Sequence, residues 1–144
     1  MNFLKKQKTK LRIAVIGYKF IPSREGGIEV VVEELAVWMV ALGNDVTCYN
    51  RKNKKVGKGK NDRKYKQIFL KSVPTINCKG LAAITSSVFA SIFASFGRYD
   101  FVHYHAEGPS IMCWLPKLFR KRIVVTNHGL QAMNKRLKYG FFCM

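Results

Sequence analysis

The sequence predicts an α/β fold in which a doubly wound parallel sheet carries helices on both faces. Short apolar runs such as residues 11–17 (LRIAVIG) are typical of parallel strands that are buried on both sides. These runs alternate with segments of helical periodicity, which implies right-handed crossovers between parallel strands. The 144 residues, 48% of them hydrophobic, suffice for the core of one domain but not of two.

The first strand leads through a loop with two glycines into a predicted helix. From Ile28 to Val40 the apolar residues recur at spacings of three and four. Early glutamates and the following Gly43 are typical of the two ends of a helix. The remaining elements are predicted as strands at residues 46–49, 66–73, 100–105 and 121–127, and as helices at residues 80–97 and 109–119.

The chain is strongly basic, with a formal net charge of +18. Such a charge favours anionic partners: nucleic acid, acidic lipid headgroups or phosphorylated substrates. Residues 51–66 hold nine Lys or Arg against the single Asp62 and are predicted to form a mobile basic loop. The basic side chains that we assign to contact with a membrane surface are Arg51, Lys52, Lys54, Lys55, Lys58, Lys60, Arg63 and Lys64.

Residues 80–97 (GLAAITSSVFASIFASFG) carry no charge and require a separate interpretation. A segment of about eighteen residues is at the lower limit for spanning a bilayer. Five Ser or Thr dilute its hydrophobicity, and its small residues suit packing on a sheet. We therefore expect a buried or interfacial helix rather than a transmembrane one.

The cysteines and the amino-terminal residues are typical of a cytoplasmic protein. Cys48, Cys78, Cys113 and Cys143 are widely spaced, without a C-x-x-C pair or a nearby His at metal-ligand spacing. Residues 1–10 form a basic extension, and the apolar stretch after them is too short for the core of a signal peptide.

Candidate binding residues follow three of the predicted strands. Ligands of open parallel sheets bind beyond the carboxyl ends of the strands, where these loops converge. Gly26 and Gly27 would let backbone N–H groups approach a phosphate, although a tight turn explains them equally well. No G-x-G-x-x-G or P-loop pattern is present, so an independent dinucleotide or ATP site is not expected.

Histidines and one glutamate follow or end the later strands. His128, at a strand end before Gly129, is placed either to bind a sugar hydroxyl or to cap the next helix. Glu107 is either a base or a solvated carboxylate. His103 and His105 share a face of their strand, but without a third ligand we do not expect a metal site.

Three segments carry a resemblance to a known family. They are residues 17–36, which include GYKFIPSREGGIE and VEELA, residues 100–105 (DFVHYH) and residues 125–130 (VTNHGL). In order and spacing they resemble bacterial glycosyltransferases of the retaining family 4, many of which are rhamnosyl- or hexosyltransferases of capsule and O-antigen synthesis. The pattern departs after residue 130, where Gln131 and Ala132 replace an acidic residue and a Trp.

The resemblance implies a GT-B fold, in which two Rossmann-like lobes enclose the active site. Residues 11–144 would be the amino-terminal, acceptor-side lobe. Residues 26–27 would face the donor's phosphates, and His128, with Gly129, would lie beside the transferred sugar. Arg24 and Glu107 would line the acceptor side. The second lobe normally binds the nucleotide sugar, and we expect it to be missing or encoded separately, so that the chain alone is inactive.

The expected function is hexosyl or rhamnosyl transfer from a nucleotide sugar to a lipid-linked glycan at the inner face of the cytoplasmic membrane. The nucleotide sugar is a substrate, and no cofactor is expected. The positive charge would hold the lobe against anionic lipid. The alternatives are a nucleic-acid-binding module and a non-catalytic remnant or subunit. Nucleic-acid binding is disfavoured because the basic run has only Tyr65 as an interleaved aromatic residue and contains no nucleic-acid-binding motif.

Overall fold

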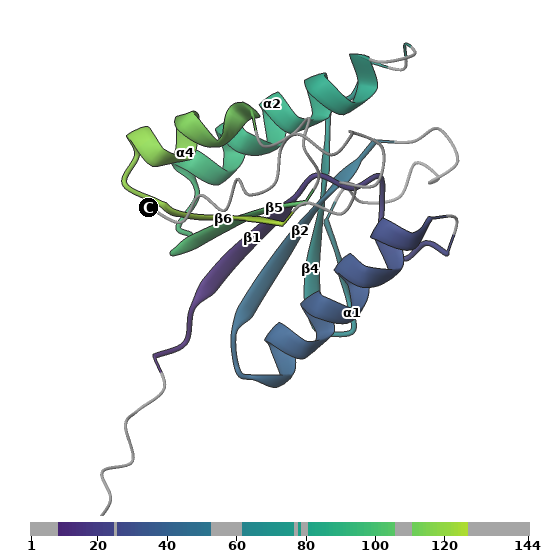
Figure 1. Ribbon diagram of the computed structural model, residues 1–144. Helices are drawn as coiled ribbons and strands as arrows, with labels where there is room; N and C mark the ends of the chain where they lie inside the picture. The colour runs from purple at the N-terminus through teal and green to yellow at the C-terminus, as the bar shows by residue number, and fades with distance from the viewer. Residues whose placement is uncertain are drawn as a thin grey trace, which may run out of the picture.

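The computed structural model describes residues 9–24, 26–52, 62–76, 78, 81–105 and 111–126. Its centre is a six-stranded sheet with the order β3-β4-β2-β1-β5-β6 (Figure 1). All neighbours pair in parallel except β3 and β4, which are antiparallel. The strands are β1 (Arg12–Ile16), β2 (Asp45–Arg51), β3 (Asp62–Tyr65), β4 (Ile68–Val73), β5 (Phe101–His105) and β6 (Arg122–Thr126). The predicted α/β class is confirmed.

Strand β1 shows why the central strands read as continuous apolar runs. Ile13 and Val15 pack into the core on one face of the sheet, and Ala14 and Ile16 pack into the core on the other. Because successive side chains point to opposite faces, a strand covered on both sides needs apolar residues at every position.

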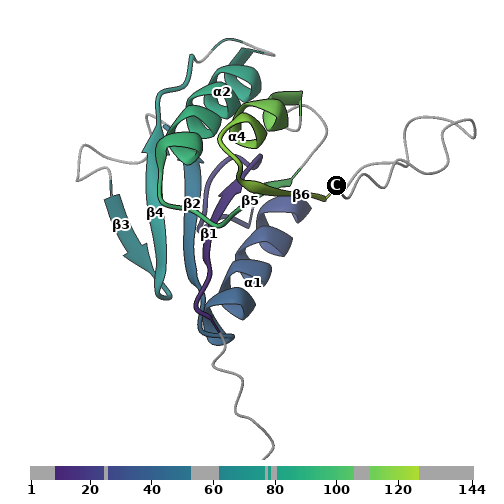
Figure 2. The same cartoon turned by 90° about the vertical axis from the view of Figure 1, so that its left-hand side faces the viewer.

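The helices cover both faces of the sheet, as predicted. Helix α1 (Gly27–Ala41) lies on one face, and α2 (Leu81–Phe96), the 3₁₀ turn η1 (Ile111–Cys113) and α4 (Trp114–Leu118) lie on the other (Figures 1 and 2). Val32 and Ala36 of α1 join the first core, and Ala90 and Ala94 of α2 join the second. In the described part of the chain, no helix has the length and apolar character needed to cross a membrane.

The expectation of a basic loop through residues 51–66 is wrong at its end. Residues 62–65 form β3, which pairs with β4 so that Tyr65 lies opposite Ile68. Lys66 (φ 45°) and Gln67 (φ 65°) form the two-residue turn between these strands, so β4 begins at Ile68 rather than at Lys66. Positive φ at both turn residues matches the right-handed twist of a hairpin. Residues 53–61 lie outside the described residues.

The helix expected at residues 109–119 is shorter than the sequence indicates. A 3₁₀ turn at residues 111–113 precedes α4, which ends at Leu118. Pro116 lies in the first turn of α4, where a missing backbone N–H costs little.

Candidate functional site

The three strands that precede the candidate residues are neighbours in the sheet. β5 lies between β1 and β6, with Ile16 opposite Tyr104 and His105 opposite Thr126. The segments that leave the carboxyl ends of these strands therefore start side by side, as expected for a binding edge. Glu107, His128 and Gly129 lie outside the described residues, so their positions stay predictions.

Gly17, directly after β1, marks a close approach between backbones. Its φ is +110°, a region that side chains rarely adopt, and a Cβ there would collide with the carbonyl oxygen of His105. Only glycine lets the chain turn out of β1 this near to the end of β5.

The loop between β1 and α1 is fastened to the end of β2. The backbone N–H of Ile21 donates to Asn50 Oδ1 over 3.0 Å, and Asn50 Nδ2 donates to the carbonyl of Ile21 over 2.8 Å. The N–H of Arg51 donates to the carbonyl of Lys19 over 2.8 Å. These bonds fix the loop that ends at the predicted phosphate-binding glycines.

The two glycines at the start of α1 have different surroundings. Gly26 is the N-cap in an extended conformation, and a Cβ on it would run into the carboxylate of Glu29. Around Gly27, apart from its chain neighbours and the backbone of α1, no atom of the described residues lies within 4 Å of the place that a Cβ would take. Backbone N–H groups and the helix dipole make the start of a helix attractive to anions. Gly27 therefore leaves more room than Gly26 for a ligand at the start of α1.

The charges of Glu29 and Arg51 influence each other beside the loop. Glu29 is buried, and its Oε1 accepts a hydrogen bond from the N–H of Lys19 over 3.3 Å. Burial lowers the pKa of the half-buried Arg51, and the carboxylate of Glu29 partly offsets this effect. Arg51 was predicted to contact a membrane surface, and Glu29 was not among the predicted site residues. A glutamate in the first turn after two glycines was the available signal for Glu29.

Arg24 lies near a second carboxylate of α1. Tyr65 and Lys66 donate hydrogen bonds to Glu33 Oε1 over 3.0 and 2.9 Å. Burial alone would raise the pKa of Glu33, but these bonds and the charges of Lys66 and Arg24 lower it overall. Glu33 thus ties the β3–β4 turn to α1, and the charge of Arg24 acts on the same carboxylate.

The two histidines of β5 lie together. The rings of His103 and His105 are 4.1 Å apart, and His103 Nε2 is 2.8 Å from Thr126 Oγ1. His105 is buried. Among the described residues, no group of three or more His, Cys, Asp or Glu is placed to bind a metal ion. Instead, the contact with Thr126 links β5 to β6 just before the predicted His128 segment.

The buried cysteine of β2 is unsuited to nucleophilic chemistry. Burial raises the pKa of Cys48 to about 12, despite a hydrogen bond with Tyr18 that lowers it. The thiol therefore stays protonated at neutral pH. Cys78 is exposed and Cys113 is half-buried, and both are free thiols.

The residues assigned to a membrane surface are only partly described. Lys52 and Lys64 are exposed, and the Lys64 Nζ lies 5.2 Å from the centre of the Phe69 ring. Arg63 belongs to β3. The lysines at 54, 55, 58 and 60 lie outside the described residues.

The comparison with protein families gives a match over most of the chain. The family model described as Glycosyltransferase Family 4 matches residues 25–142, from the start of α1 to beyond β6. The chain matches no curated protein sequence.

Proposed function

The chain belongs to glycosyltransferase family 4, and from this premise we propose that it takes part in hexosyl or rhamnosyl transfer from a nucleotide sugar to a lipid-linked glycan. The pathway that we propose is the synthesis of a bacterial capsule or O-antigen. The observation that carries the proposal is the family match over residues 25–142, which includes every element from α1 to β6.

The carboxyl edge of the sheet supports this proposal. The loop before α1 is fastened to β2 through Asn50, and Gly27 opens toward free space at the positive end of the helix. In our proposal, Gly26 and Gly27 face the donor's phosphates and His128 contacts the transferred sugar. Arg24, Glu107 and Gly129 complete the substrate side.

We further propose that this chain is the acceptor-side lobe and that a second lobe binds the nucleotide. Two-lobe catalysis depends on holding the donor phosphate and the reacting sugar in one geometry. The basic residues between Arg51 and Lys64 would attract the lobe to anionic lipid at the cytoplasmic face, where each cation near the surface contributes about 1 kcal/mol.

A transfer assay tests the proposal. The purified chain is incubated with labelled nucleotide sugars and lipid-linked glycans from bacterial membranes, both alone and with a separately produced donor lobe of a family 4 enzyme. We expect label in the lipid product only when both lobes are present. His128→Ala and Gly27→Ala should each lower the rate, and Trp38→Phe, on the exposed side of α1, should leave it unchanged.

Two results would contradict the proposal. Turnover by the 144-residue chain alone would disprove the division into lobes. Binding of RNA or DNA at physiological salt, together with no transfer when the donor lobe is added, would favour the nucleic-acid alternative.

A further inference from the structure

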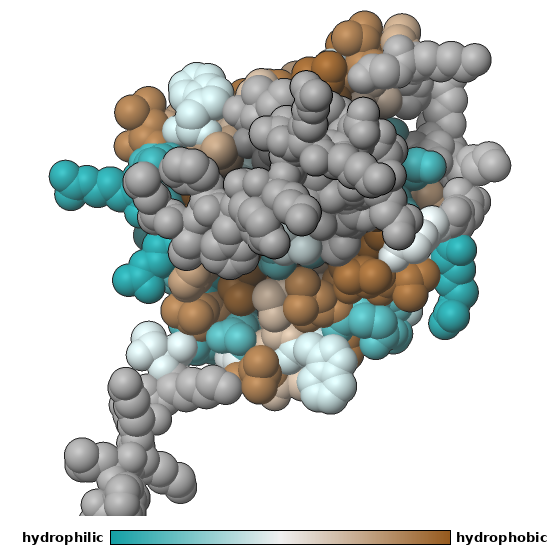
Figure 3. Space-filling model, in the orientation of Figure 1, coloured by the Kyte–Doolittle hydropathy of each residue, from teal (hydrophilic) through white to brown (hydrophobic). Residues whose placement is uncertain are grey.

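Helix α2 turns its large apolar side chains away from the sheet. It buries alanines and serines, whereas Leu81, Ile84, Phe93 and Phe96 are exposed. Figure 3 shows hydrophobic side chains along the upper edge of the molecule, where α2 runs in Figure 1. An amphipathic helix of a water-exposed domain has the opposite arrangement, so this side of α2 is suited to a further apolar contact.

Helix α4 and its following turn enlarge this surface. α2 and α4 lie side by side, and the rings of Phe96 and Phe119 are 4.9 Å apart (Figures 1 and 2). Trp114 and Leu118 of α4 are also exposed. We define the apolar α2–α4 face as Leu81, Ile84, Phe93, Phe96, Trp114, Leu118 and Phe119.

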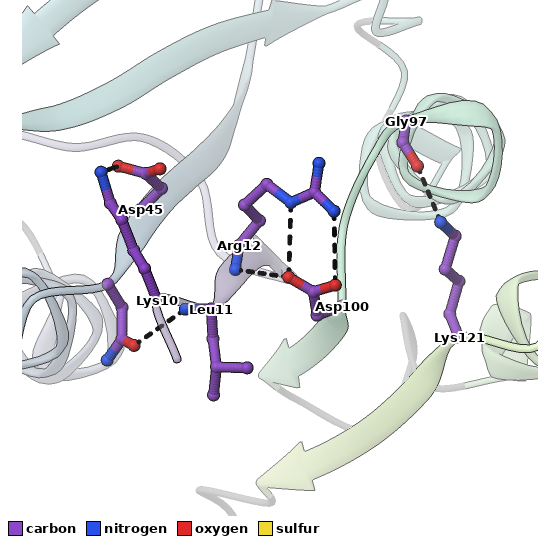
Figure 4. Close-up of polar contacts among 8 residues, drawn as sticks. Lys10, Leu11, Arg12, Asp45, Gly97, Asp100 and Lys121 are labelled. Carbon is purple, nitrogen blue, oxygen red and sulfur yellow. Dashed lines mark hydrogen bonds and ion pairs between the residues drawn. The ribbon is translucent and has the colours of Figure 1, made fainter. Parts of the chain in front are cut away.

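A basic groove adjoins this face at the amino end of the strands. It has a volume of about 590 Å³ and is lined by residues 9–12, 99–100 and 119–122. Five of these residues are cations, and Asp100 is the acid among them. Arg12 pairs with Asp100, and Lys121 donates to the carbonyl of Gly97 over 2.8 Å (Figure 4). Lys10 pairs with Asp45 over 2.8 Å, which leaves Arg120 and Arg122 as groove cations that no carboxylate of the described residues pairs.

The groove and the apolar face meet at Phe119. This side chain lines the groove and also packs against Phe96. Exposed cations Arg98 and Lys117 lie at the same end of the helices, and the sequences of α2, η1 and α4 contain no acidic residue. A continuous surface thus offers apolar and aromatic side chains bordered by cations.

We propose that the apolar α2–α4 face lies on a bilayer that contains anionic lipid, with the neighbouring cations at the level of the headgroups. Apolar and aromatic side chains bordered by Lys and Arg are typical of proteins that bind at the membrane interface. Anionic headgroups complement the border of the face, whereas a second copy of the chain would bring like charges together. Insertion of α2 across the bilayer would instead break the contact of Ser91 with Tyr104, which is 2.7 Å long.

This inference extends the proposed function by naming the surface that would bring the lobe to its lipid-linked acceptor. It differs from the proposed contact of the basic residues between 51 and 64, because it rests on α2, α4 and the groove. Its test measures lipid binding without sugar transfer, so the two proposals can fail independently.

The two tryptophans of the chain provide a matched pair of reporters. Trp38 on α1 is 66% exposed, and Trp114 on α4 is 59% exposed. Trp38→Phe leaves Trp114 as the reporter, and Trp114→Phe leaves Trp38. With vesicles of phosphatidylglycerol and phosphatidylcholine, Trp114 emission should shift to the blue and be quenched by lipids with a spin label in the acyl chain. Trp38 emission should not respond, and vesicles of phosphatidylcholine alone should bind weakly.

Substitutions at exposed positions test the two parts of the surface. The double variant Phe96→Ser/Leu118→Ser should lower vesicle partitioning on the order of tenfold. Lys117→Gln and Arg120→Gln should each lower it about fivefold at low salt. The matched control Val31→Ser, at an exposed apolar position of α1, should change neither partitioning nor the circular dichroism spectrum.

Three outcomes would overturn the inference. In the first, Trp114 stays in water while the chain is bound to vesicles, and only the double variant Lys54→Gln/Lys55→Gln loses vesicle binding. The second is an equal response of both tryptophans. The third is a lipid-independent dimer in analytical ultracentrifugation that Phe96→Ser/Leu118→Ser dissociates, because a second copy would then cover the face.

Discussion

Helices α1 and α2 cover opposite faces of one sheet with opposite chemistry. α1 packs Val32 and Ala36 on the sheet and buries two glutamates that are held by hydrogen bonds from other elements. α2 packs only alanines and serines and has no charged residue. Its large apolar residues lie on the outside.

In our proposals, the difference separates two tasks of the chain. The buried glutamates of α1 fix the glycine loop and the β3–β4 turn, so this side orients the edge at which we propose that the ligand binds. On the α2 side, serine hydroxyl groups donate hydrogen bonds to uncharged backbone carbonyls of the same helix. Ser95 donates to the carbonyl of Ser91 over 2.7 Å, and Ser87 donates to the carbonyl of Ala83 over 2.6 Å. Small residues let α2 approach the sheet closely, while its bulky residues lie exposed.

The largest effect on stability is expected from a comparison of substitutions on the buried and the exposed side of α2. Ala94→Phe places an aromatic ring at a fully buried position and should lower the free energy of unfolding by about 3 kcal/mol. Phe93→Ala, one residue earlier and exposed, should change it by less than about 0.5 kcal/mol. Urea denaturation followed by circular dichroism measures both. Equal losses would mean that Phe93 contributes to the core.

An intermediate effect on stability is expected from the substitution Glu33→Gln on α1. Loss of the charge that Lys66 and Tyr65 contact should lower the free energy of unfolding by about 1 kcal/mol at pH 7. The neighbouring Glu34→Gln is a matched control, because Glu34 is exposed. Urea titrations of both variants and the native chain measure the difference.

The effect of Glu33→Gln should depend on pH. Burial raises the pKa of Glu33, but the hydrogen bonds from Lys66 and Tyr65 outweigh this effect. The pKa is therefore lowered in the folded chain. The ionised form therefore stabilises the fold at pH values above the unfolded pKa of about 4.3. This contribution should disappear as the pH falls through the lower, folded pKa. If the native chain and the Glu33→Gln variant still differ in the free energy of unfolding at pH 2, the charge of Glu33 is not the cause of the difference.

The smallest effect on stability is expected at the start of α1. Gly27→Ala places a methyl group in open space and should raise the free energy of unfolding by up to about 0.5 kcal/mol. Gly26→Ala should lower it by a similar amount, because the carboxylate of Glu29 must move and alanine is a poor N-cap. Thermal unfolding of both variants tests this, and a loss in Gly27→Ala would point to an unseen contact at that position.

Several elements could be predicted from the sequence because their signals are local. The apolar run of β1, the periodicity of α1 and the small residues of α2 each reflect burial of one segment, and the structure confirms all three. The β3–β4 hairpin was missed because Lys66 and Gln67 adopt positive φ without the glycine or asparagine that normally marks such a turn. The short length of α4 likewise has no clear signal in its residues.

Apolar patterns and motif spacing are properties of the chain order, so they were enough to predict the class of fold and to reveal the family resemblance with the segments that carry it. Which residues meet depends on the packing of the elements. Glu29 and Arg51 are distant in sequence, and only the parallel pairing of β1 with β2 brings them to the same loop. Phe96 and Phe119 join because α2 and α4 lie on the same face of the sheet. Such contacts depend on packing between elements, which no local pattern specifies.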